Sequence, residues 1–293
     1  MKIVPGPASR ELGLQVAELL GADVVPVEHK LFPDGESYVR FDGSVEGETV
    51  AIVQSTYPPQ DKHLIELCLL ADAAKDLGAE RVVAVVPYMA YARQDKRFLS
   101  GEAISINTVL KLLEVSGVDK LITVDIHNEE ALKRTRMETV NLTAVPLLAR
   151  YLAEEKGLSG AFALAPDRGA LKRAEEASTI LGGGFGWLHK ERSRITGEVR
   201  VEEKALDVSG RTVIIFDDMI STGGTIVAAT ELLKKQGASR VYAACTHPLL
   251  VKGALKRILE SGCDGVIGTD SIPSPVSVVH IAPLLARELR NEL

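Results

Sequence analysis

The chain has 293 residues, of which 46% are hydrophobic and 25% are charged, and its formal net charge is −6. This balance is typical of a protein with substantial buried cores, and the length suits about two domains. The acidic charge excludes a global basic field for nucleic acid or anionic lipid, and the apolar runs are too short to cross a bilayer. We therefore expect neither a nucleic-acid partner nor a membrane.

The amino terminus and the cysteines indicate a cytoplasmic protein. The first residues, MKIVPGPAS, lack the apolar core of a signal peptide. Cys68, Cys245 and Cys263 are scattered without a CxxC pair, which is typical of buried thiols in a reducing cytosol. Asn and Gln are scarce, at four and five residues, beside abundant Glu, Lys and Arg, and this composition favours a thermophilic source.

The first half of the chain alternates apolar strands with amphipathic helices. Continuous apolar runs rich in β-branched residues predict strands buried on both faces over 50–53, 82–87 and 121–126. Apolar residues at helical spacing predict helices over 64–77 and 106–115. This alternation predicts a parallel sheet covered by helices.

The second half repeats the first. KDLGAERVVA at 75–84 matches KKQGASRVYA at 234–243, and SGVDKLITVD at 116–125 matches SGCDGVIGTD at 261–270. The offset is 159 in the first pair and 145 in the second, so the first copy holds an insertion around 88–101. Two matches in the same order indicate duplication of a whole domain.

The boundary between the two copies is expected near 141–146, where Pro146 precedes a new helix. We therefore predict an amino-terminal domain over 1–143, a carboxy-terminal domain over 144–280, and a terminal helix over 281–293.

The segment VIIFDDMISTGGT at 213–225 combines a buried strand, two carboxylates and a small-residue turn that opens a helix. The backbone N–H groups of such a turn suit a phosphate, while Asp217 and Asp218 would repel it and so suit ribose hydroxyls, directly or through a metal. A simple capped helix start is the alternative, but paired acids beside STGGT exceed what capping requires. The predicted phosphate-binding residues are Ser221, Thr222, Gly223, Gly224 and Thr225.

The duplication places this site in the second copy. When 48–62 is aligned with 211–225, Gln54 and Ser55 stand where the second copy has Asp217 and Asp218. The first copy therefore lacks the acidic pair, and the second is expected to retain the phosphate site.

The segment 213–225 resembles the phosphoribosyl-pyrophosphate loop of type I phosphoribosyltransferases and of ribose-phosphate diphosphokinases. Alone it leaves both families open. The tandem duplication and the segments below resemble the diphosphokinases, nearly from end to end. The resemblance implies an α/β fold of two tandem phosphoribosyltransferase-like domains, each a mainly parallel sheet flanked by helices.

The resemblance also implies the reaction. A ribose-phosphate diphosphokinase transfers the β,γ-diphosphoryl group of Mg-ATP to the C1 hydroxyl of ribose 5-phosphate, giving 5-phosphoribosyl 1-diphosphate and AMP. The expected substrates are ATP and ribose 5-phosphate, and the expected cofactor is Mg²⁺. Members share active sites between subunits, so we expect a homo-oligomer that is at least a dimer.

Two segments of the first copy resemble ATP-binding parts of the family. LFPDGE at 31–36 looks like the adenine-contacting loop that reaches a neighbouring subunit. Phe32 would stack on the base, and Asp34 and Glu36 would accept from its amino edge or orient the loop; a plain Pro-Asp-Gly turn is the alternative.

YMAYARQDKR at 88–97 resembles the stretch that binds the ATP phosphates, and a solvated charge run is the alternative. Arg93 and Gln94 would meet the phosphates with help from Arg97, because the guanidinium group offers a fixed fork of donors. His127 follows a buried strand and, by resemblance, would be a ligand of the ATP-bound magnesium.

Two segments of the second copy resemble the remaining parts of the site. LAPDRGA at 164–170 looks like the diphosphate loop, with Asp167, Arg168 and Gly169 on the diphosphate and Asp167 also on magnesium. Many members carry a second glycine where this chain has Ala170. HKERS at 189–193 looks like the catalytic loop, and a strand would turn its Lys190 and Arg192 to the same side.

Three rival functions need fewer of these features. A phosphoribosyltransferase would not need the 31–36 loop, the insertion or His127. A catalytically silent partner could lose His127, Lys190 or Arg192, yet all three are present. A transcriptional regulator would need a DNA-reading helix or basic stripe, which the acidic chain does not offer. The GxxxxGK[ST] motif of P-loop kinases is also missing from the sequence.

Overall fold

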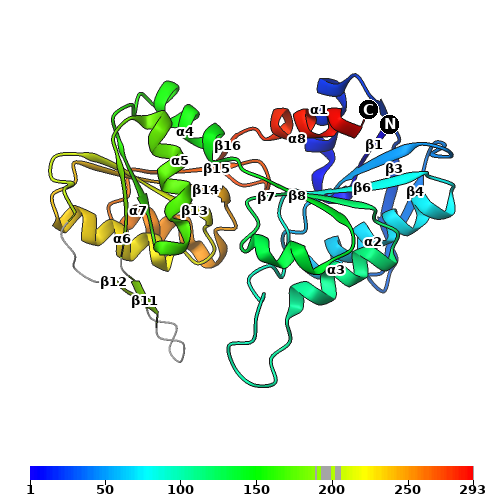
Figure 1. The fold of residues 1–293 in the computed structure, drawn as a ribbon, viewed down its shortest axis with the longest axis horizontal. Helices are drawn as coiled ribbons and strands as arrows, with labels where there is room; N and C mark the ends of the chain where they lie inside the picture. The colour runs from blue at the N-terminus through cyan, green and yellow to red at the C-terminus, as the bar shows by residue number, and fades with distance from the viewer. Residues whose placement is uncertain (189, 193–198, 202–205, 293) are drawn as a thin grey trace. The chain divides into compact units, whose positions relative to one another are not determined.

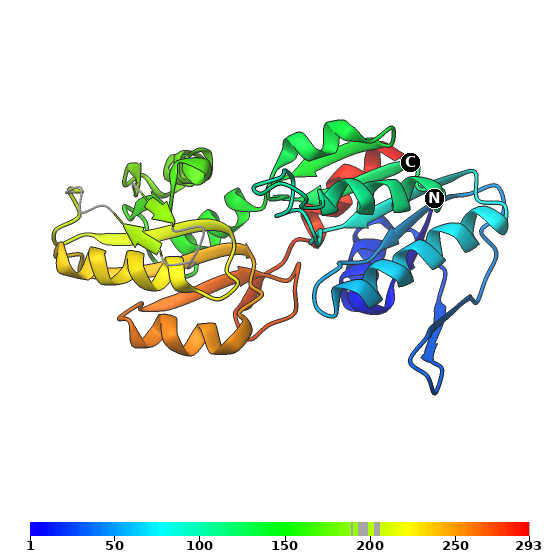
Figure 2. The same cartoon turned by 90° about the horizontal axis from the view of Figure 1, so that it is seen from below.

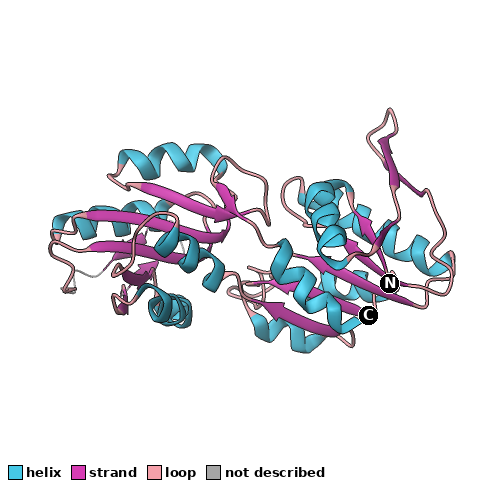
Figure 3. Cartoon of the chain, turned by 90° about the horizontal axis from the view of Figure 1, so that it is seen from above, coloured by secondary structure: helices cyan, strands magenta, loops and turns pink. Residues whose placement is uncertain are grey.

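A computed structural model describes residues 1–188, 190–192, 199–201 and 206–292. It divides into two compact units (Figure 1). The first unit comprises Met1–Leu142 with Ile281–Leu293, and the second comprises Thr143–His280. Each unit is built on a six-stranded sheet in which all neighbouring strands are parallel, with helices on both faces (Figure 3). The expected α/β fold with a parallel sheet in each copy is confirmed.

The first unit has the strand order β2-β1-β5-β6-β7-β8, and an antiparallel hairpin, β3-β4, follows β2 in the chain. The strands are β1 (Lys2–Pro5), β2 (Asp23–Val24), β3 (Val27–Leu31), β4 (Ser37–Phe41), β5 (Thr49–Val53), β6 (Arg81–Val86), β7 (Lys120–Val124) and β8 (Glu138–Leu142). The helices are α1 (Arg10–Leu20), α2 (Gln60–Asp76), α3 (Ser105–Val115) and α8 (Ala282–Leu289), with short 3₁₀ turns η1 (Pro7–Ser9), η2 (Glu129–Arg134) and η5 (Arg290–Glu292).

The second unit has the order β10-β9-β13-β14-β15-β16, with the hairpin β11-β12 following β10. Its strands are β9 (Phe162–Ala165), β10 (Phe185–Trp187), β11 (Lys190–Arg192), β12 (Val199–Val201), β13 (Thr212–Met219), β14 (Arg240–His247), β15 (Gly265–Thr269) and β16 (Ser277–Val279). Its helices are α4 (Val145–Glu154), α5 (Leu171–Leu181), α6 (Gly224–Lys235) and α7 (Ala254–Glu260), with 3₁₀ turns η3 (Arg168–Ala170) and η4 (Val251–Gly253).

The two units have the same topology, because the strand orders match position by position and the hairpin enters at the same place. Strands β6 and β14 begin at the paired residues Arg81 and Arg240 of the sequence repeat. The insertion of the first copy lies between β6 and α3, over 87–104, where the second unit has only 248–253 between β14 and α7. The structure therefore shows the duplication that the sequence indicates.

The carboxy-terminal helix α8 belongs to the first unit. From the sequence, 281–293 was predicted only as a terminal helix outside both domains. It packs on α1, just as α4 packs on α5 in the second unit. The two helices are counterparts, since residues 146–150 and 283–287 both read PLLAR. Burial of the apolar face of α8, with Leu285 and Leu289 fully inaccessible, explains why it joins this core.

Charged residues fasten α8 and η5 to the sheet of the first unit. The ammonium of Lys120, which is only 3% exposed, lies 2.7 Å from Glu292 Oε1, 3.0 Å from Glu138 Oε1 and 3.3 Å from Glu288 Oε1. Arg81 adds ion pairs to Glu138 and Glu292. Burial alone lowers the pKa of Lys120, but its hydrogen bonds to the three carboxylates outweigh burial and raise it above the usual value.

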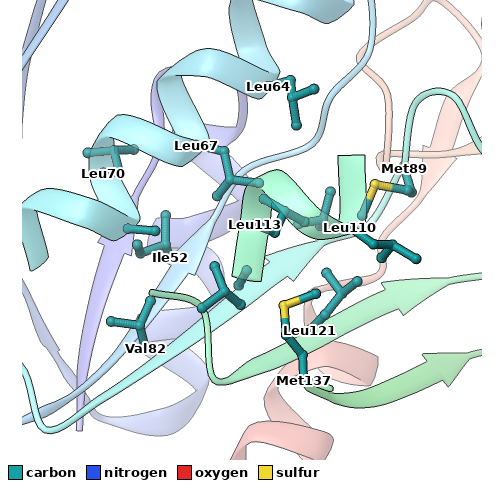
Figure 4. Close-up of a cluster of buried hydrophobic side chains, with 14 of the residues drawn as sticks. Ile52, Leu64, Leu67, Leu70, Val82, Met89, Leu110, Leu113, Leu121 and Met137 are labelled. Atoms are coloured by element: carbon teal, nitrogen blue, oxygen red, sulfur yellow. The ribbon is translucent and has the colours of Figure 1, made fainter. Parts of the chain in front are cut away.

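The core of the first unit lies between α2, α3 and one face of the sheet (Figure 4). Strand residues alternate between the two faces, so Ile52 and Val82 meet α2 and α3 while Ala51 and Val83 are buried on the other face. Both faces are covered, and this is why the strands read as continuous apolar runs. Across the part of the chain that is described, no helix has both the length and the apolarity needed to cross a bilayer.

Candidate active site

The acidic pair of the second unit stands at the end of β13. The strand continues through both carboxylates, further than the apolar run alone suggests, with Asp217 paired to Cys245 and Met219 to His247 of β14. Asp218 is 4% exposed, while Asp217 is half-buried and its Oδ1 accepts from the Asp218 N–H at 2.9 Å. The pair therefore lies where ligands bind in open parallel sheets, at the carboxyl ends of strands.

The electrostatics of the pair favour a ligand. Burial first, then the charge of Asp218 and a hydrogen bond between the two carboxyl groups, raise the pKa of Asp217 well above 3.8. The nearby charge of Asp167 acts in the same direction, and Arg173 opposes it. Sugar hydroxyls or a cation would relieve this repulsion. Arg173 of α5 is a residue that sequence reasoning missed, since nothing in its local pattern marks it.

The turn after β13 is held by the residues that follow β14. The N–H groups of Leu250 and Val251 donate to the carbonyls of Ile220 at 2.9 Å and Ser221 at 3.1 Å. Arg257 Nη2 donates to the Thr222 carbonyl at 2.8 Å. These contacts fix the carbonyls of the turn, while the first N–H groups of α6 have no partner within the helix and suit an anion.

Gly223 is required in this turn for two reasons. It caps α6 with a φ of 78°, a left-handed conformation that favours glycine. A Cβ atom there would lie 2.9 Å from Ile258 Cδ1, whereas Gly224 has nothing within 4 Å. The turn thus depends on close packing against α7, which the sequence motif alone does not reveal.

The predicted diphosphate loop forms the link between β9 and α5. Oδ1 of Asp167 accepts from the N–H groups of Gly169 at 2.9 Å and Ala170 at 3.2 Å, so this carboxylate caps η3. Arg168 and Gly169 are exposed. Ala170, in place of the second glycine of many members, is 3% exposed and belongs to the hydrophobic core.

The predicted catalytic-loop residues Lys190 and Arg192 both lie in β11. This strand pairs antiparallel with β12, Lys190 opposite Val201 and Arg192 opposite Val199. The two residues are two positions apart in this strand, and their predicted role on one side of it stays a prediction. Residues 189, 193–198 and 202–205 of this stretch lie outside the described part of the chain.

In the first unit, the 31–36 segment is the tip of the β3-β4 hairpin, which extends from its own unit (Figure 2). Phe32 N–H donates to the Glu36 carbonyl and Gly35 N–H to the Phe32 carbonyl, each at 2.8 Å. Asp34 Oδ1 accepts from Glu36 N–H at 3.2 Å, so this carboxylate orients the turn. The side chain of Phe32 is 43% exposed. Its ring lies edge-on to the ring of Tyr38, with 5.8 Å between the two ring centroids.

The insertion is organised by Glu102, which sequence reasoning also missed. Its carboxylate accepts from the N–H groups of Leu99 and Phe98, and these bonds lower its pKa. Gln94 Nε2 donates to the same carboxylate at 3.3 Å, and Arg97 Nε donates to the Glu102 carbonyl at 2.9 Å. Arg93 is exposed and has no hydrogen bond or ion pair to any described residue.

His127 follows β7 and is exposed beside a strained turn. Asp125 has a φ of 43°, which a non-glycine residue rarely adopts, and Asn141 Oδ1 accepts from the Ile126 N–H at 3.0 Å. The side chain of Asn128 donates to the buried carboxylate of Asp95 in the insertion. This bond joins the segment that carries Arg93 and Gln94 to the segment that carries His127.

Comparison with known proteins decides the family. Residues 1–117 match the N-terminal domain of ribose phosphate pyrophosphokinase, and residues 201–286 match the phosphoribosyl synthetase-associated domain. The ribose-phosphate pyrophosphokinase of Methanopyrus kandleri is 44% identical over 96% of both chains. That of Sulfurisphaera tokodaii is 40% identical over 99% of this chain and 100% of its own. The chain belongs to the ribose-phosphate pyrophosphokinase family.

A solved member of this family supports the fold as well. The crystal structure of phosphoribosylpyrophosphate synthetase from Mycobacterium smegmatis has 36% sequence identity to this chain and a TM-score of 0.89. The match covers 99% of this chain and 98% of the other. The chain is therefore an enzyme of the ribose-phosphate diphosphokinase class, which confirms the family, the fold class and the activity expected from the sequence.

Proposed function

We propose that the chain transfers the β,γ-diphosphoryl group by in-line attack of the ribose 5-phosphate C1 hydroxyl on the β-phosphorus of Mg-ATP, with AMP leaving. The acidic pair and anion-binding turn at the end of β13 are the observation that supports this mechanism most directly. The protein needs to form no covalent intermediate, because positioning and charge neutralisation supply most of the catalysis of such transfers.

At the ribose end, the turn binds the 5-phosphate and the acidic pair binds the sugar. The N–H groups at the start of α6 and the hydroxyls of Ser221, Thr222 and Thr225 donate to the phosphate. Asp217 and Asp218 accept from the ribose hydroxyls. A hydroxyl that donates to Asp217 stabilises the ionised carboxylate, whose pKa burial and Asp218 raise in the free protein.

At the nucleotide end, Phe32 stacks on the adenine of ATP in a neighbouring subunit, and its 43% exposure leaves the ring available. Asp34 orients the turn through the Glu36 N–H, which leaves the Glu36 side chain to accept from the adenine amino group. Arg93 and Gln94, assisted by Arg97, bind the phosphates. A site completed by a neighbour makes the active enzyme at least a dimer.

The residues present fit a magnesium ion that is held mainly by substrate. No three His, Cys, Asp or Glu side chains among the described residues are close enough together to hold a metal. Magnesium typically takes one or two protein ligands and completes its shell with phosphate oxygens and water. His127 and Asp167 would each supply one ligand. When bound, the ion would supply positive charge that offsets the charge of the ATP phosphates.

The leaving group is stabilised by the second unit. Lys190 and Arg192 neutralise the charge that develops on the α-phosphate as AMP departs. The N–H groups of the diphosphate loop, beside Arg168 and Gly169, bind the transferred group. Asp167 holds this loop in shape through the Gly169 and Ala170 N–H groups.

The test is to incubate the purified protein with Mg-ATP and ribose 5-phosphate and to follow AMP and ADP separately. We expect AMP in equal amount to a diphosphorylated sugar, and we expect Lys190→Ala and Asp217→Ala to abolish it. Formation of ADP instead would mean single phosphoryl transfer and would contradict the mechanism. No turnover, together with tight binding of 5-phosphoribosyl diphosphate, would favour a phosphoribosyltransferase or a silent partner.

A further inference from the structure

We propose that Glu66 is a positioning residue for ATP, because it fixes the β3-β4 hairpin on α2 and so places the Phe32 ring before the nucleotide binds. The inference rests on the proposed contact between Phe32 and adenine. Glu66 lies in the middle of α2 and touches none of the predicted site residues, so it would act only through the hairpin.

One carboxylate oxygen joins both strands of the hairpin to the helix. Nε2 of His29, from β3, lies 2.7 Å from Glu66 Oε1, and Ser37 Oγ, from β4, donates to the same oxygen at 2.9 Å. Glu66 is fully buried, with a relative exposure of 0%. Charged hydrogen bonds of this kind are strong where water is excluded.

The second carboxylate oxygen continues the link into the unit. Gln54 Nε2 donates to Glu66 Oε2 at 3.3 Å, and Gln54 Oε1 accepts from the Ala8 N–H at 2.9 Å. Lys62, one helical turn earlier, has its ammonium 3.6 Å from Glu66 Oε1. The buried charge is therefore compensated, which a carboxylate with no exposure requires.

The hairpin depends on this attachment for its position. A two-stranded hairpin is marginally stable by itself. Its outer face carries exposed contacts, with Lys30 Nζ 4.5 Å from the Tyr38 ring and Arg40 Nε 2.8 Å from Glu28 Oε2. Phe32 contacts the ring of Tyr38 on this same hairpin, so the orientation of the hairpin sets the position of the Phe32 ring.

The second unit shows that the fold does not itself require this carboxylate. The repeat that pairs 75–84 with 234–243 also brings α2 and α6 into register, and there Glu66 corresponds to Thr225, so the second unit has no carboxylate at this position. The anchor is thus specific to the hairpin that carries Phe32, which is the pattern expected of a positioning role.

The first test compares Glu66→Gln with the wild-type enzyme at a temperature well below unfolding. We expect the KM for ATP to rise about ten-fold, with the KM for ribose 5-phosphate and kcat changed far less. Backbone amides of the hairpin should exchange with solvent faster, while those of β6 and β7 should not. Unchanged ATP affinity and unchanged hairpin exchange would overturn the inference.

Two further variants separate positioning from general destabilisation. His29→Gln combined with Ser37→Ala removes the link from the hairpin side and should raise the KM for ATP in the same way, even if Glu66→Gln folds poorly. Lys120→Met disturbs a buried charge cluster of the same unit that the hairpin does not contact. It should leave the KM for ATP unchanged, and an equal rise would overturn the inference.

A double-mutant cycle with Phe32→Ala tests whether Glu66 acts through this ring. We expect Phe32→Ala to raise the KM for ATP and Glu66→Gln to add little in that background. If the two substitutions raise the KM for ATP independently, so that their fold-changes multiply in the double variant, the inference is overturned and the proposed function is left intact. A Phe32→Ala variant with normal ATP affinity would instead contradict the proposed role of Phe32, and with it this inference.

Discussion

The two units end their equivalent central strands in chemically opposite ways. Strand β13 ends in Asp217 and Asp218, whose mutual repulsion and burial oppose ionisation of Asp217. Strand β5 is followed by Gln54 and Ser55, both fully buried. The side chain of Gln54 fills the space beside Gly6, where a Cβ atom would lie 2.3 Å from Gln54 Oε1. The position proposed to bind ribose in one unit is therefore filled by a side chain in the other.

The difference teaches how one fold can serve two purposes. In the first unit, the amide of Gln54 bonds to Ala8, His63 and Glu66, so the end of the strand is satisfied by the protein and stabilises it. In the second unit, Asp217 accepts from the Asp218 N–H, yet burial and the charge of Asp218 still raise its pKa, and the proposed ribose would supply further donors. Local rules are commonly broken at binding sites for this reason.

The largest expected effect is on catalysis. Asp217→Asn should lower kcat/KM by about a thousand-fold, because it removes an acceptor for the ribose hydroxyls. The pKa of Asp217 is raised above 3.8, so its ionisation costs folding stability as the pH rises from 3.8 through the folded-state pKa. At neutral pH the variant should therefore unfold at an equal or higher temperature. Steady-state kinetics measure kcat/KM, and calorimetry measures the unfolding temperature. A lower Tm in the variant would show that Asp217 stabilises its unit, as Gln54 does after β5, and would contradict the comparison.

The reverse change in the first unit should affect stability. Gln54→Glu places a second carboxylate beside Glu66 in a fully buried position. It also removes the hydrogen bonds that Gln54 Nε2 donates to the His63 carbonyl and to Glu66. The free energy of unfolding should fall by about 3 kcal/mol. Urea unfolding measures the loss, and Gln54→Met is the matched variant without the added charge. Ribose 5-phosphate binding gained by the first unit would show that its site is not closed.

A smaller effect is expected from the turn itself. Gly223→Ala must hold a φ of 78° and displace Ile258, and should raise the KM for ribose 5-phosphate by about thirty-fold. Gly224→Ala is the matched control, since it meets no atom within 4 Å, and its effect should be several-fold smaller. Equal effects in the two variants would mean that the methyl group obstructs phosphate and that packing on α7 is not decisive.

The smallest effect concerns the charge cluster under α8, which the second unit lacks because Gly265 stands in the place of Lys120. Lys120→Met should lower the free energy of unfolding by about 2 kcal/mol. This is less than the usual loss when a buried ion pair is broken, because Glu138 is half-exposed and keeps its ion pair with Arg81. Activity should be unchanged at low temperature. Chemical denaturation measures the loss.

The same cluster predicts a pH dependence. Hydrogen bonds to Lys120 and Arg81 lower the pKa of Glu138, so its contribution is fully present above 4.5 and is lost as the pH falls through the lowered folded-state pKa. Between about pH 7 and pH 3, the free energy of unfolding should therefore fall less steeply with acidification in Lys120→Met than in the wild type. An unchanged slope would mean that the cluster does not stabilise the native state.

The fold was largely predictable, and the site only in part. The expected strands and helices appear within a few residues, since apolar periodicity directly reflects which faces are buried. The acidic pair and the turn could be proposed as a site from the sequence because their residues are consecutive. Asn128 and Arg173 were missed because each acts on a segment that is distant in the sequence. Glu102 was missed although it accepts from the nearby Phe98 and Leu99 N–H groups, because a carboxylate in an irregular loop leaves no periodic pattern.

The sequence by itself determined the duplication, the parallel sheets and the segments at the strand ends, because each depends on residue spacing within a short stretch. Only the tertiary structure decided that α8 joins the first unit and that Glu66 binds both strands of the hairpin. It also decided that Ile258 excludes a side chain at Gly223. These features depend on atoms brought together by packing, and spacing along the chain carries no information about such contacts.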